Sequence, residues 1–453
     1  MVVSRERTPN AQETFMQMAQ AAGLRGRLLI TIGLILLVRL GVRIPVPGVD
    51  RAAFAQAVQD SPISGFLNFL SGGGLSAVGI FALGILPFIN ASIIMQLLTA
   101  GLPYLENLQK NEGEAGRRKI SQITRYVALA SAVFNAFGLA TFVQPYAYDP
   151  GPIFLLKTVI ALSAGSMFVI WLAELITERG IGNGPSLLIF VNIVAVLPRT
   201  LGNTIEFAQA GGREAIAQVV VLALVFLVMI VGIVFVQEGM RKIPIVSARR
   251  QVGKRLYRER TSYLPLRVNQ GGVLPIIFAS TLLILPSSLA QFTQGGGTTN
   301  PEEQTGGLTA TLNEFLVQIS TYMNPSGPTP WLYVSVYLLL ILFFSYFYAA
   351  LVVNPVDMSQ NLKKMGASIP GIRPGKATSD YLQKVINRLT LLGAIFLGIV
   401  ATVPTAVETA TGVTTFQGLG ATSLLILVGV AIDTAKQIQS RVISQRYEGM
   451  VKE

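Results

Sequence analysis

The residue types that perform most enzyme chemistry are absent from this chain. Its 453 residues include no cysteine and no histidine, which excludes thiolate nucleophiles, histidine metal ligands, Ser-His hydrolysis and imidazole proton relays. The turn PGIRPGK at 370–376 is similar to a phosphate-binding loop, but it lacks the Walker spacing and the terminal Ser or Thr, and we expect no strand before it. We therefore expect a chain that is not an enzyme, hydrolyses no ATP and holds no cofactor or metal.

The composition is that of a polytopic membrane protein. Hydrophobic residues make up 51% of the chain and charged residues 13%, and the mean hydropathy is +0.56. The first 23 residues are mostly polar, so we expect no cleavable signal peptide and a first span that acts as its own insertion signal. The fold class that follows is an all-α bundle of membrane-spanning helices.

Ten segments are apolar over about 20 residues, the length that a helix needs to cross a bilayer core. The fifth of them is the shortest. The predicted spans are 26–46, 76–102, 121–143, 153–177, 185–203, 215–237, 271–291, 331–353, 381–404 and 417–437.

Lysine and arginine are unevenly distributed between the loops, and this sets the orientation, because basic residues near span ends stay in the cytoplasm. They crowd the segments 103–125, 238–270 and 354–380, whereas the connection 289–330 contains neither type. Both termini are therefore expected in the cytoplasm.

The spans divide into two halves of five, 26–203 and 215–437, across a polar external connection at 204–214. Because five is odd, the two halves must cross the membrane in opposite senses. The second span contains GILPFINAS at 84–92 and the seventh contains GVLPIIFAS at 272–280, identical at six of nine positions. Chance explains this match as well as an internal repeat does. The flanking parts are a cytoplasmic N-terminal segment and a cytoplasmic tail, at 1–25 and 438–453.

Charged groups are scarce within the spans. Lys157, Glu174 and Asp433 lie near span ends, and snorkelling explains Arg39 and Arg43 in the outer half of the first span. In proteins of inverted topology, matching broken segments of this kind mark where a solute crosses the membrane. Here the two segments carry isoleucines in place of charged groups that could bind a polar solute. Ordinary core or lipid-facing packing also explains these isoleucines.

Eight motifs follow one another in order along the chain. They are GVRIPVPGVD (41–50), FLNFLSGG (66–73), FALGILPFINASIIMQLL (81–98), EGEAGRRKISQITRY (112–126), ITERGIGNG (176–184), YLPLRVNQGGVLPIIFAS (263–280), NPVDMSQNLKKMGASIPGIRPGK (354–376) and TSLLI (422–426). Together they resemble the bacterial-type SecY family, the channel-forming subunits of the general protein-secretion (Sec) translocon. The resemblance runs from about residue 24 to 450 and implies two inverted five-helix halves around a central pore.

The resemblance implies a role for a short apolar stretch at 63–75, which recurs at helical spacing over two turns and is too short to cross a bilayer. In the family this helix is a plug that closes the resting channel. A re-entrant or interfacial helix that never moves is an equal alternative. The apolar residues are Ile63, Phe66, Leu67, Phe69 and Leu70, and the hinge residues are Gly72, Gly73 and Gly74.

The family also narrows its pore with a ring of aliphatic side chains, which excludes ions by dewetting and offers a sliding chain no fixed hydrogen bonds. The matching positions are Ile85, Ile89, Ile189, Ile277 and Ile426. The sixth position is Pro185, and its short ring puts the contribution of the fifth span in doubt.

A lateral gate, through which signal sequences and membrane spans leave for the lipid bilayer, is implied between the second and seventh spans, with the third and eighth beside them. Modest hydrogen bonds between helices would hold such a gate shut without locking it. The candidate polar residues are Ser92, Gln96, Ser280 and Thr281.

Two basic loops, 238–270 and 354–380, suit acidic or phosphate-bearing partners. The resemblance implies that they dock the ribosome and the motor ATPase SecA, with Arg373 as the residue for motor coupling. The residues expected to serve docking are Arg249, Arg250, Lys254 and Arg255. The further implied partners are unfolded secretory and membrane-protein precursors and the small subunits SecE and SecG.

Two other protein classes remain open from the residues alone. A secondary transporter also suits inverted halves and broken helices, but it would need a polar site at the midplane that is not evident in the sequence. A membrane-embedded enzyme would need paired carboxylates that are equally absent from the spans.

The resemblance places the chain in a bacterial inner (plasma) membrane, with a thylakoid-type membrane as the alternative.

Overall fold

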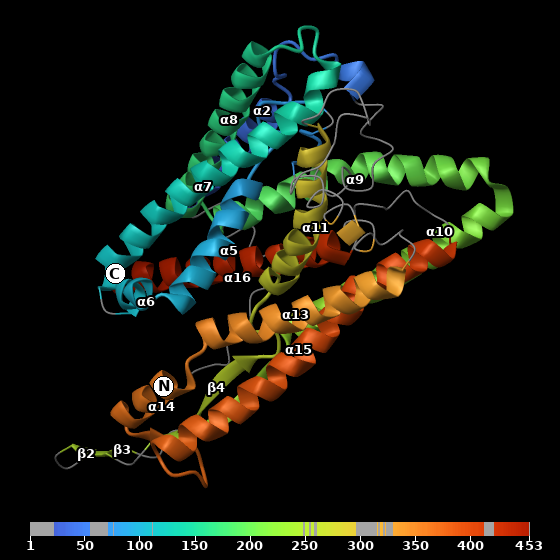
Figure 1. The fold of residues 1–453 in the computed structure, drawn as a ribbon. Coiled ribbons are helices and arrows are strands. Elements are labelled where there is room, and N and C mark those ends of the chain that lie inside the picture. Colours follow the sequence, from blue (N-terminus) through green and yellow to red (C-terminus); the bar gives the residue numbers. More distant parts are fainter. Residues whose placement is uncertain are drawn as a thin grey trace. The chain divides into compact units, whose positions relative to one another are not determined.

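The computed structural model describes residues 22–54, 71–75, 77–110, 112–247, 250–252, 255–257, 261–295, 329–411 and 421–452, together with Phe315, Gln318, Ile319 and Tyr322. The chain is predominantly helical (Figure 1). Its main helices are α2 (Ala22–Val42), α5 (Leu86–Gly101), α6 (Pro103–Lys110), α7 (Gly113–Val143), α8 (Pro152–Arg179), α9 (Gly184–Ala210), α10 (Gly212–Glu238), α11 (Leu274–Gly295), α13 (Pro330–Val352), α14 (Pro355–Lys364), α15 (Lys376–Thr411) and α16 (Ala421–Lys452).

A helix overlaps each of the ten predicted spans, although not all of these helices meet the requirement for crossing a membrane. Among the described residues, six helices are long and apolar enough, and the pair α5 and α6 makes a seventh if its 103° bend belongs to one span. The chain is thus a multi-pass membrane protein, and the count of ten spans stays a prediction.

The two matching words GILP and GVLP adopt the same local structure. Gly84 has φ +51° and Gly272 has φ +59°, and in each case a helix begins two residues later with proline as its second residue. Glycine tolerates this left-handed conformation, and proline has no N–H to lose in a first helical turn. For this reason α5 begins at Leu86, ten residues after the predicted start of the second span.

The contacts divide the chain into two compact units, and the first holds Met1–Ile205, Gln417–Leu419 and Ile426–Glu453. Within it α5 packs against α7 and α7 packs against α8 (Figure 1). Four fully buried alanines recur every fourth residue along α7 and let the neighbouring helices approach closely. They are Ala128, Ala132, Ala136 and Ala140.

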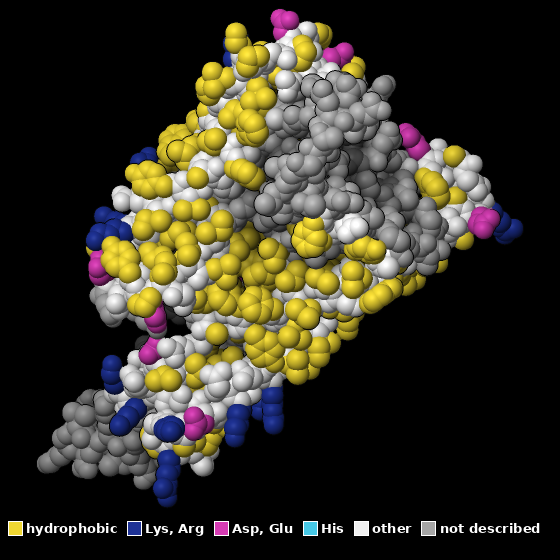
Figure 2. All heavy atoms as spheres, in the orientation of Figure 1, with side chains coloured by type: hydrophobic (Ala, Val, Ile, Leu, Met, Phe, Trp, Pro, Cys, Tyr) yellow, Lys and Arg dark blue, Asp and Glu magenta, His cyan; other side chains and the backbone are white. Residues whose placement is uncertain are grey.

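The second unit comprises Glu206–Phe416 and Gly420–Leu425. In it α15 packs against α10 and α13, and α13 packs against α11. The predicted connection at 204–214 is mostly helical, because α9 continues to Ala210 and α10 begins at Gly212. Figure 2 shows hydrophobic side chains covering the exposed faces of α13 and α15, whereas lysines and arginines gather near α14.

The two basic loops fold together in the second unit. Strand β1 (Met240–Ser247) lies between β4 (Thr261–Arg267) and the two-residue strand β5 (Ala367–Ser368), with Val246 opposite Ser368. Apolar residues of these strands form one buried cluster with α14 and the start of α15. We call β1, β4, β5, α14 and residues 369–389 the loop module. The strand β5 corrects the expectation that no strand precedes PGIRPGK.

Candidate functional site

The described residues of 71–85, which precede α5, form a series of turns that we call the irregular segment, and hydrogen bonds attach it to the residues after α2. The N–H of Val46 donates to the carbonyl of Val78 at 2.9 Å, and the N–H of Ile80 donates to the carbonyl of Ile44 at 2.9 Å. Helix α8 holds the other end, because the Ser166 hydroxyl donates to the Gly84 carbonyl at 3.0 Å. These bonds satisfy backbone groups that would otherwise be costly at membrane depth.

Two of the predicted ring residues lie where this segment becomes helical. Ile85 occupies the N-cap of α5, Ile89 follows four residues later, and both are buried. Residues four apart share a helix face, so their side chains point the same way. The bond from Ser166 to Gly84 therefore fixes the position of Ile85.

Ile189 is buried on α9, and Pro185 is the second residue of that helix. Proline at this place removes no intrahelical hydrogen bond, so Pro185 does not distort the helix start. Because it lies four residues before Ile189, the two residues share one face. The side chain of Pro185 is still shorter than that of isoleucine, so it extends less far from this face of α9.

The remaining ring candidates are buried on two other helices. Ile277 lies on α11 in the second unit, whereas Ile426 lies on α16 in the first. All five isoleucines are thus inside the protein and not on its surface. The ring that would join them stays a prediction.

The plug prediction falls mostly outside the described residues. Ile63, Phe66, Leu67, Phe69 and Leu70 all lie there, while Gly72, Gly73 and Gly74 are described. Gly72 has φ +63° and Gly73 has φ +88°, so two of the three hinge glycines adopt the left-handed conformation that glycine alone tolerates easily.

Next to this glycine segment lies a polar cluster that the sequence analysis missed. The Arg39 guanidinium on α2 donates to the Gly72 carbonyl and to the Asn192 side-chain carbonyl, each at 3.2 Å. Arg39 is half-buried and Asn192 is buried, which replaces the snorkelling explanation for Arg39. A lone asparagine inside an apolar span was the available signal, since such residues are rare and costly in lipid.

Asn135 is a second such asparagine. Its amide nitrogen on α7 donates to the Ser131 carbonyl at 2.8 Å and to the Ser131 hydroxyl at 3.2 Å. The same search for lone asparagines would have found it.

The lateral-gate candidates differ in how they are bonded. Ser280 and Thr281 donate their hydroxyls to the carbonyl of Ile277 in their own helix, at 2.9 and 2.8 Å. Ser92 and Gln96 are half-buried on α5, and the Gln96 carbonyl oxygen is buried without a hydrogen-bond partner among the described residues. The gate stays a prediction, with Gln96 the one candidate whose polar atom needs a further donor.

Arg373 lies in a loop that hydrogen bonds hold at both ends. The carbonyl of Arg373 accepts from the Thr378 hydroxyl at 2.9 Å, and the carbonyl of Gly375 accepts from the Ser359 hydroxyl at 2.7 Å. Gly371 and Gly375 have φ +79° and +108°. The Arg373 side chain is exposed, so this loop presents a cation on a fixed turn.

The other docking candidates belong to a hairpin that Figure 1 shows extending away from α15. Arg250 begins β2 (Arg250–Val252) and Arg255 begins β3 (Arg255–Tyr257), and the two strands pair antiparallel. Arg249 and Lys254 lie outside the described residues.

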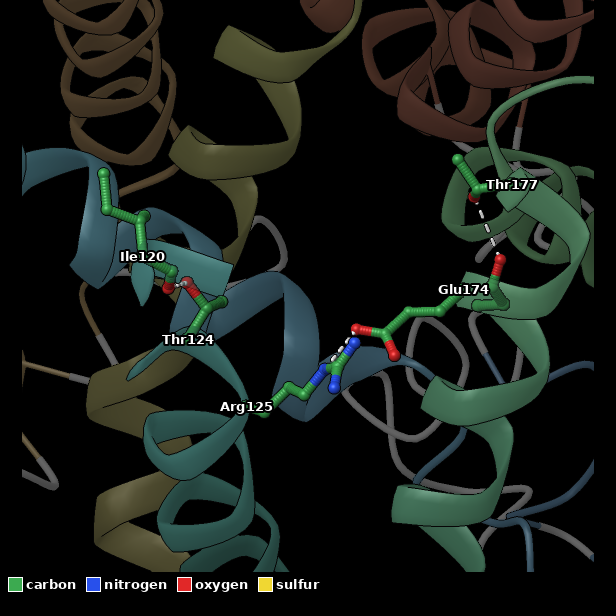
Figure 3. A network of polar contacts seen from close by, with 6 residues as sticks. Ile120, Thr124, Arg125, Glu174 and Thr177 are labelled. Atoms are coloured by element: carbon green, nitrogen blue, oxygen red, sulfur yellow. Dashed lines mark hydrogen bonds and ion pairs between the residues drawn. The ribbon is translucent and has the colours of Figure 1, made fainter. Parts of the chain in front are cut away.

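One ion pair joins two spans of the first unit. The Arg125 guanidinium on α7 bonds the Glu174 carboxylate on α8 at 2.8 Å (Figure 3). Glu174 is the less exposed of the two side chains. This carboxylate near the end of a span is thereby paired, and it is not available as a solute-binding group. Among the described residues, no cluster of three or more Asp or Glu side chains could hold a metal ion.

The fold and these side chains define a polytopic helical membrane protein with irregular, broken spans and with buried aliphatic residues at the breaks. The family model named SecY matches residues 79–435. This chain belongs to the SecY family.

Curated relatives and solved structures agree with that assignment. The chain is 69% identical over 454 residues to the "Protein translocase subunit SecY" of Synechocystis sp., covering 100% of both. A solved structure on the plug domain of SecY has a TM-score of 0.64 at 18% identity, covering 93% of both chains. A structure of Sec61 in the canine ribosome-channel complex has a TM-score of 0.58 at 19% identity, also covering 93% of both. These two structures share the fold of this chain.

Proposed function

We propose that this chain is a protein-conducting channel, through which unfolded secretory polypeptides cross the membrane and from which signal sequences and membrane spans leave sideways into lipid. The observation that carries the proposal is the 69% identity, over the whole chain, to a relative named a protein translocase subunit. The match covers all of both chains, so it includes every predicted span and both basic loops.

The local chemistry of the broken spans supports this function. Ile85, Ile89, Ile189, Ile277 and Ile426 are buried, and a collar of such side chains holds no water and offers a passing chain no hydrogen bonds. An unfolded polypeptide brings backbone N–H and C=O groups that cost several kcal/mol each in hydrocarbon. It therefore needs a path through protein that is wet on both sides of one short dry constriction.

The energy for transport comes from outside this chain. The motor ATPase SecA or the ribosome docks on the loop module and on the β2–β3 hairpin, where Arg373, Arg250 and Arg255 supply cations. Support for the ribosome comes from a solved relative of the same fold that is described in a ribosome-channel complex. SecE and SecG are the small subunits of the complex.

The location that suits this function is the inner membrane of a bacterium, with both termini in the cytoplasm. The named relative comes from Synechocystis sp., so a thylakoid-type membrane is the second location of the proposal. The basic loop module then faces the cytoplasm, which agrees with the placement of Lys and Arg.

The test is to crosslink a stalled secretory precursor to a photoreactive residue at position 277. Crosslinks at the buried Ile277 and none at the exposed Leu339 on α13 are the expected result. A second measurement is the conductance of planar bilayers after deletion of 63–73. A plugged channel leaks after this deletion, whereas a secondary transporter loses activity without leaking, and the latter result overturns the proposal.

A further inference from the structure

Arg39 is the arginine of α2 whose guanidinium turns into the protein. It spans three separate parts of the first unit, since it lies on α2 and bonds Gly72 of the irregular segment and Asn192 of α9. Arg43, four residues later, has an exposed side chain. The two arginines therefore carry equal charge on one helix end but differ in their surroundings.

The side chains of Arg39 and Asn192 approach Gly72 so closely that this position has no room for a Cβ atom. A Cβ atom at this position would overlap Arg39 Nη1 and would lie 2.6 Å from Asn192 Oδ1, far inside van der Waals contact. At Gly73, which also has a positive φ, a Cβ atom would have nothing within 4 Å. Both glycines thus serve the backbone turn, but only Gly72 is required by the approach of Arg39 and Asn192.

The residues after Gly72 are anchored by their own hydrogen bonds. The N–H of Leu75 donates to the Ser71 hydroxyl at 3.1 Å, and the N–H of Gly79 donates to the Gly74 carbonyl at 3.0 Å. The bridge between Pro45 and Gly79 then ties this turn to the end of α2. Gly72 is therefore the residue at which this hydrogen-bonded turn begins, and the Arg39 guanidinium bonds the carbonyl oxygen of Gly72.

The strength of this contact is intermediate. Arg39 is a cation, but both of its acceptors are neutral oxygens, so each bond is stronger than a neutral pair and weaker than a bond to a carboxylate. Such an arrangement holds a backbone in place and can still be broken by a moderate competing force. A carboxylate in place of the Asn192 amide would hold it much more tightly.

We propose that Arg39 and Asn192 form a latch on the Gly72 carbonyl that favours the closed form of the channel, with Arg39 as the positioning residue. The latch rests on the proposed channel function. It acts on the turn that begins at Gly72 and sets how readily this turn leaves the position in which Arg39 holds it. Opening breaks the two bonds of Arg39, and closing restores them.

The experiment compares ion leak through the full-length chain, purified with its associated subunits and reconstituted in planar bilayers. Arg39→Gln removes the guanidinium and is expected to raise the resting leak at least roughly tenfold, because both charge-assisted hydrogen bonds of Arg39 are lost. Arg43→Gln makes the same charge change on the same helix end and is expected to leave the leak unchanged. Asn192→Asp is expected to act in the opposite direction, with a smaller leak and slower export.

A latch predicts that the leak rises in Arg39→Gln and falls in Asn192→Asp, and these opposite changes distinguish it from a structural contact. A contact that only stabilises the fold predicts a lower melting temperature for Arg39→Gln with the leak unchanged, and that result overturns the latch. If Arg39→Gln does not insert into the membrane, the ion leak of Asn192→Ala is compared with that of Asn192→Asp. Equal leak through these two variants also overturns the latch.

The deletion of 63–73 distinguishes the two proposals. If the deletion leaks and Arg39→Gln matches Arg43→Gln, only the latch fails. If the deletion does not leak, the channel function fails and the latch fails with it.

Discussion

The hydroxyl of Ser166 on α8 donates a hydrogen bond of 3.0 Å to the carbonyl oxygen of Gly84, and both groups are buried. Gly84 lies directly before Ile85, so this single bond connects a packed span to the first predicted ring residue. The carbonyl belongs to a residue with positive φ outside any helix, and the Ser166 hydroxyl is the donor that the described structure provides for it.

We predict that Ser166→Ala destabilises the protein by about 1–3 kcal/mol, because it leaves a buried carbonyl without its donor. Ser163→Ala on the same helix is the matched control. The Ser163 hydroxyl is buried without a hydrogen-bond partner among the described residues, so its removal costs little. Melting temperatures in detergent measure both changes, and an equal loss for the two variants contradicts the assigned role of the bond.

Two glycines of α9 are expected to respond oppositely to alanine. At Gly184 an added Cβ atom overlaps the carbonyl of Ala173 on α8, and this backbone contact cannot move without shifting a helix. At Gly202 the same atom has nothing within 4 Å. Gly184→Ala therefore lowers the melting temperature, whereas Gly202→Ala raises stability by up to about 1 kcal/mol through helix propensity. A neutral Gly184→Ala would show that α8 and α9 approach less closely than described.

The loop module is expected to depend on its buried apolar cluster. Leu382 is fully buried there, and Leu382→Ala should cost about 2–5 kcal/mol through the cavity it leaves. Met365, the residue directly after α14, is 61% exposed, and Met365→Ala should cost little. Limited proteolysis of the full-length protein measures the difference as faster cleavage within 354–380 for Leu382→Ala. Equal cleavage rates would mean that the two basic loops do not share a core.

Arg373→Glu is expected to abolish motor-driven secretion while the protein remains inserted and folded. The side chain is exposed, and the turn beneath it is held by bonds to backbone atoms, so reversing the charge alters the presented surface and not the fold. Lys363→Glu makes the same charge reversal on exposed α14 and is expected to keep most of the secretion. Secretion from inverted vesicles measures both variants, and normal export by Arg373→Glu refutes the docking role.

Some of the fold could be predicted from local patterns. Long apolar segments predicted where helices lie, and the words GILP and GVLP marked two helix starts that have the same geometry. The pattern did not show that the helix of the second span begins only at Leu86, because apolarity alone does not reveal that Gly84 takes a positive φ. Helix ends depend on single backbone angles, which hydropathy does not record.

The polar contacts were much harder to predict. Arg39 and Asn192 are 153 residues apart, and each one alone is explained by snorkelling or by chance. The strand pair of Val246 with Ser368 involves only two residues of β5, which is too short for any periodic signal. Charge counts found two basic loops but did not show that they form one module.

The sequence by itself determined that this is a multi-pass helical membrane protein of the SecY family. Lipid offers no hydrogen bonds, so each span must satisfy its own backbone and must carry its apolar residues contiguously, and both features are local. Only the tertiary structure decided which polar groups meet, such as Arg39 with Gly72 and Ser166 with Gly84. Such pairs join distant parts of the chain, and a hydrogen bond between them forms only when packing brings both atoms within about 3 Å.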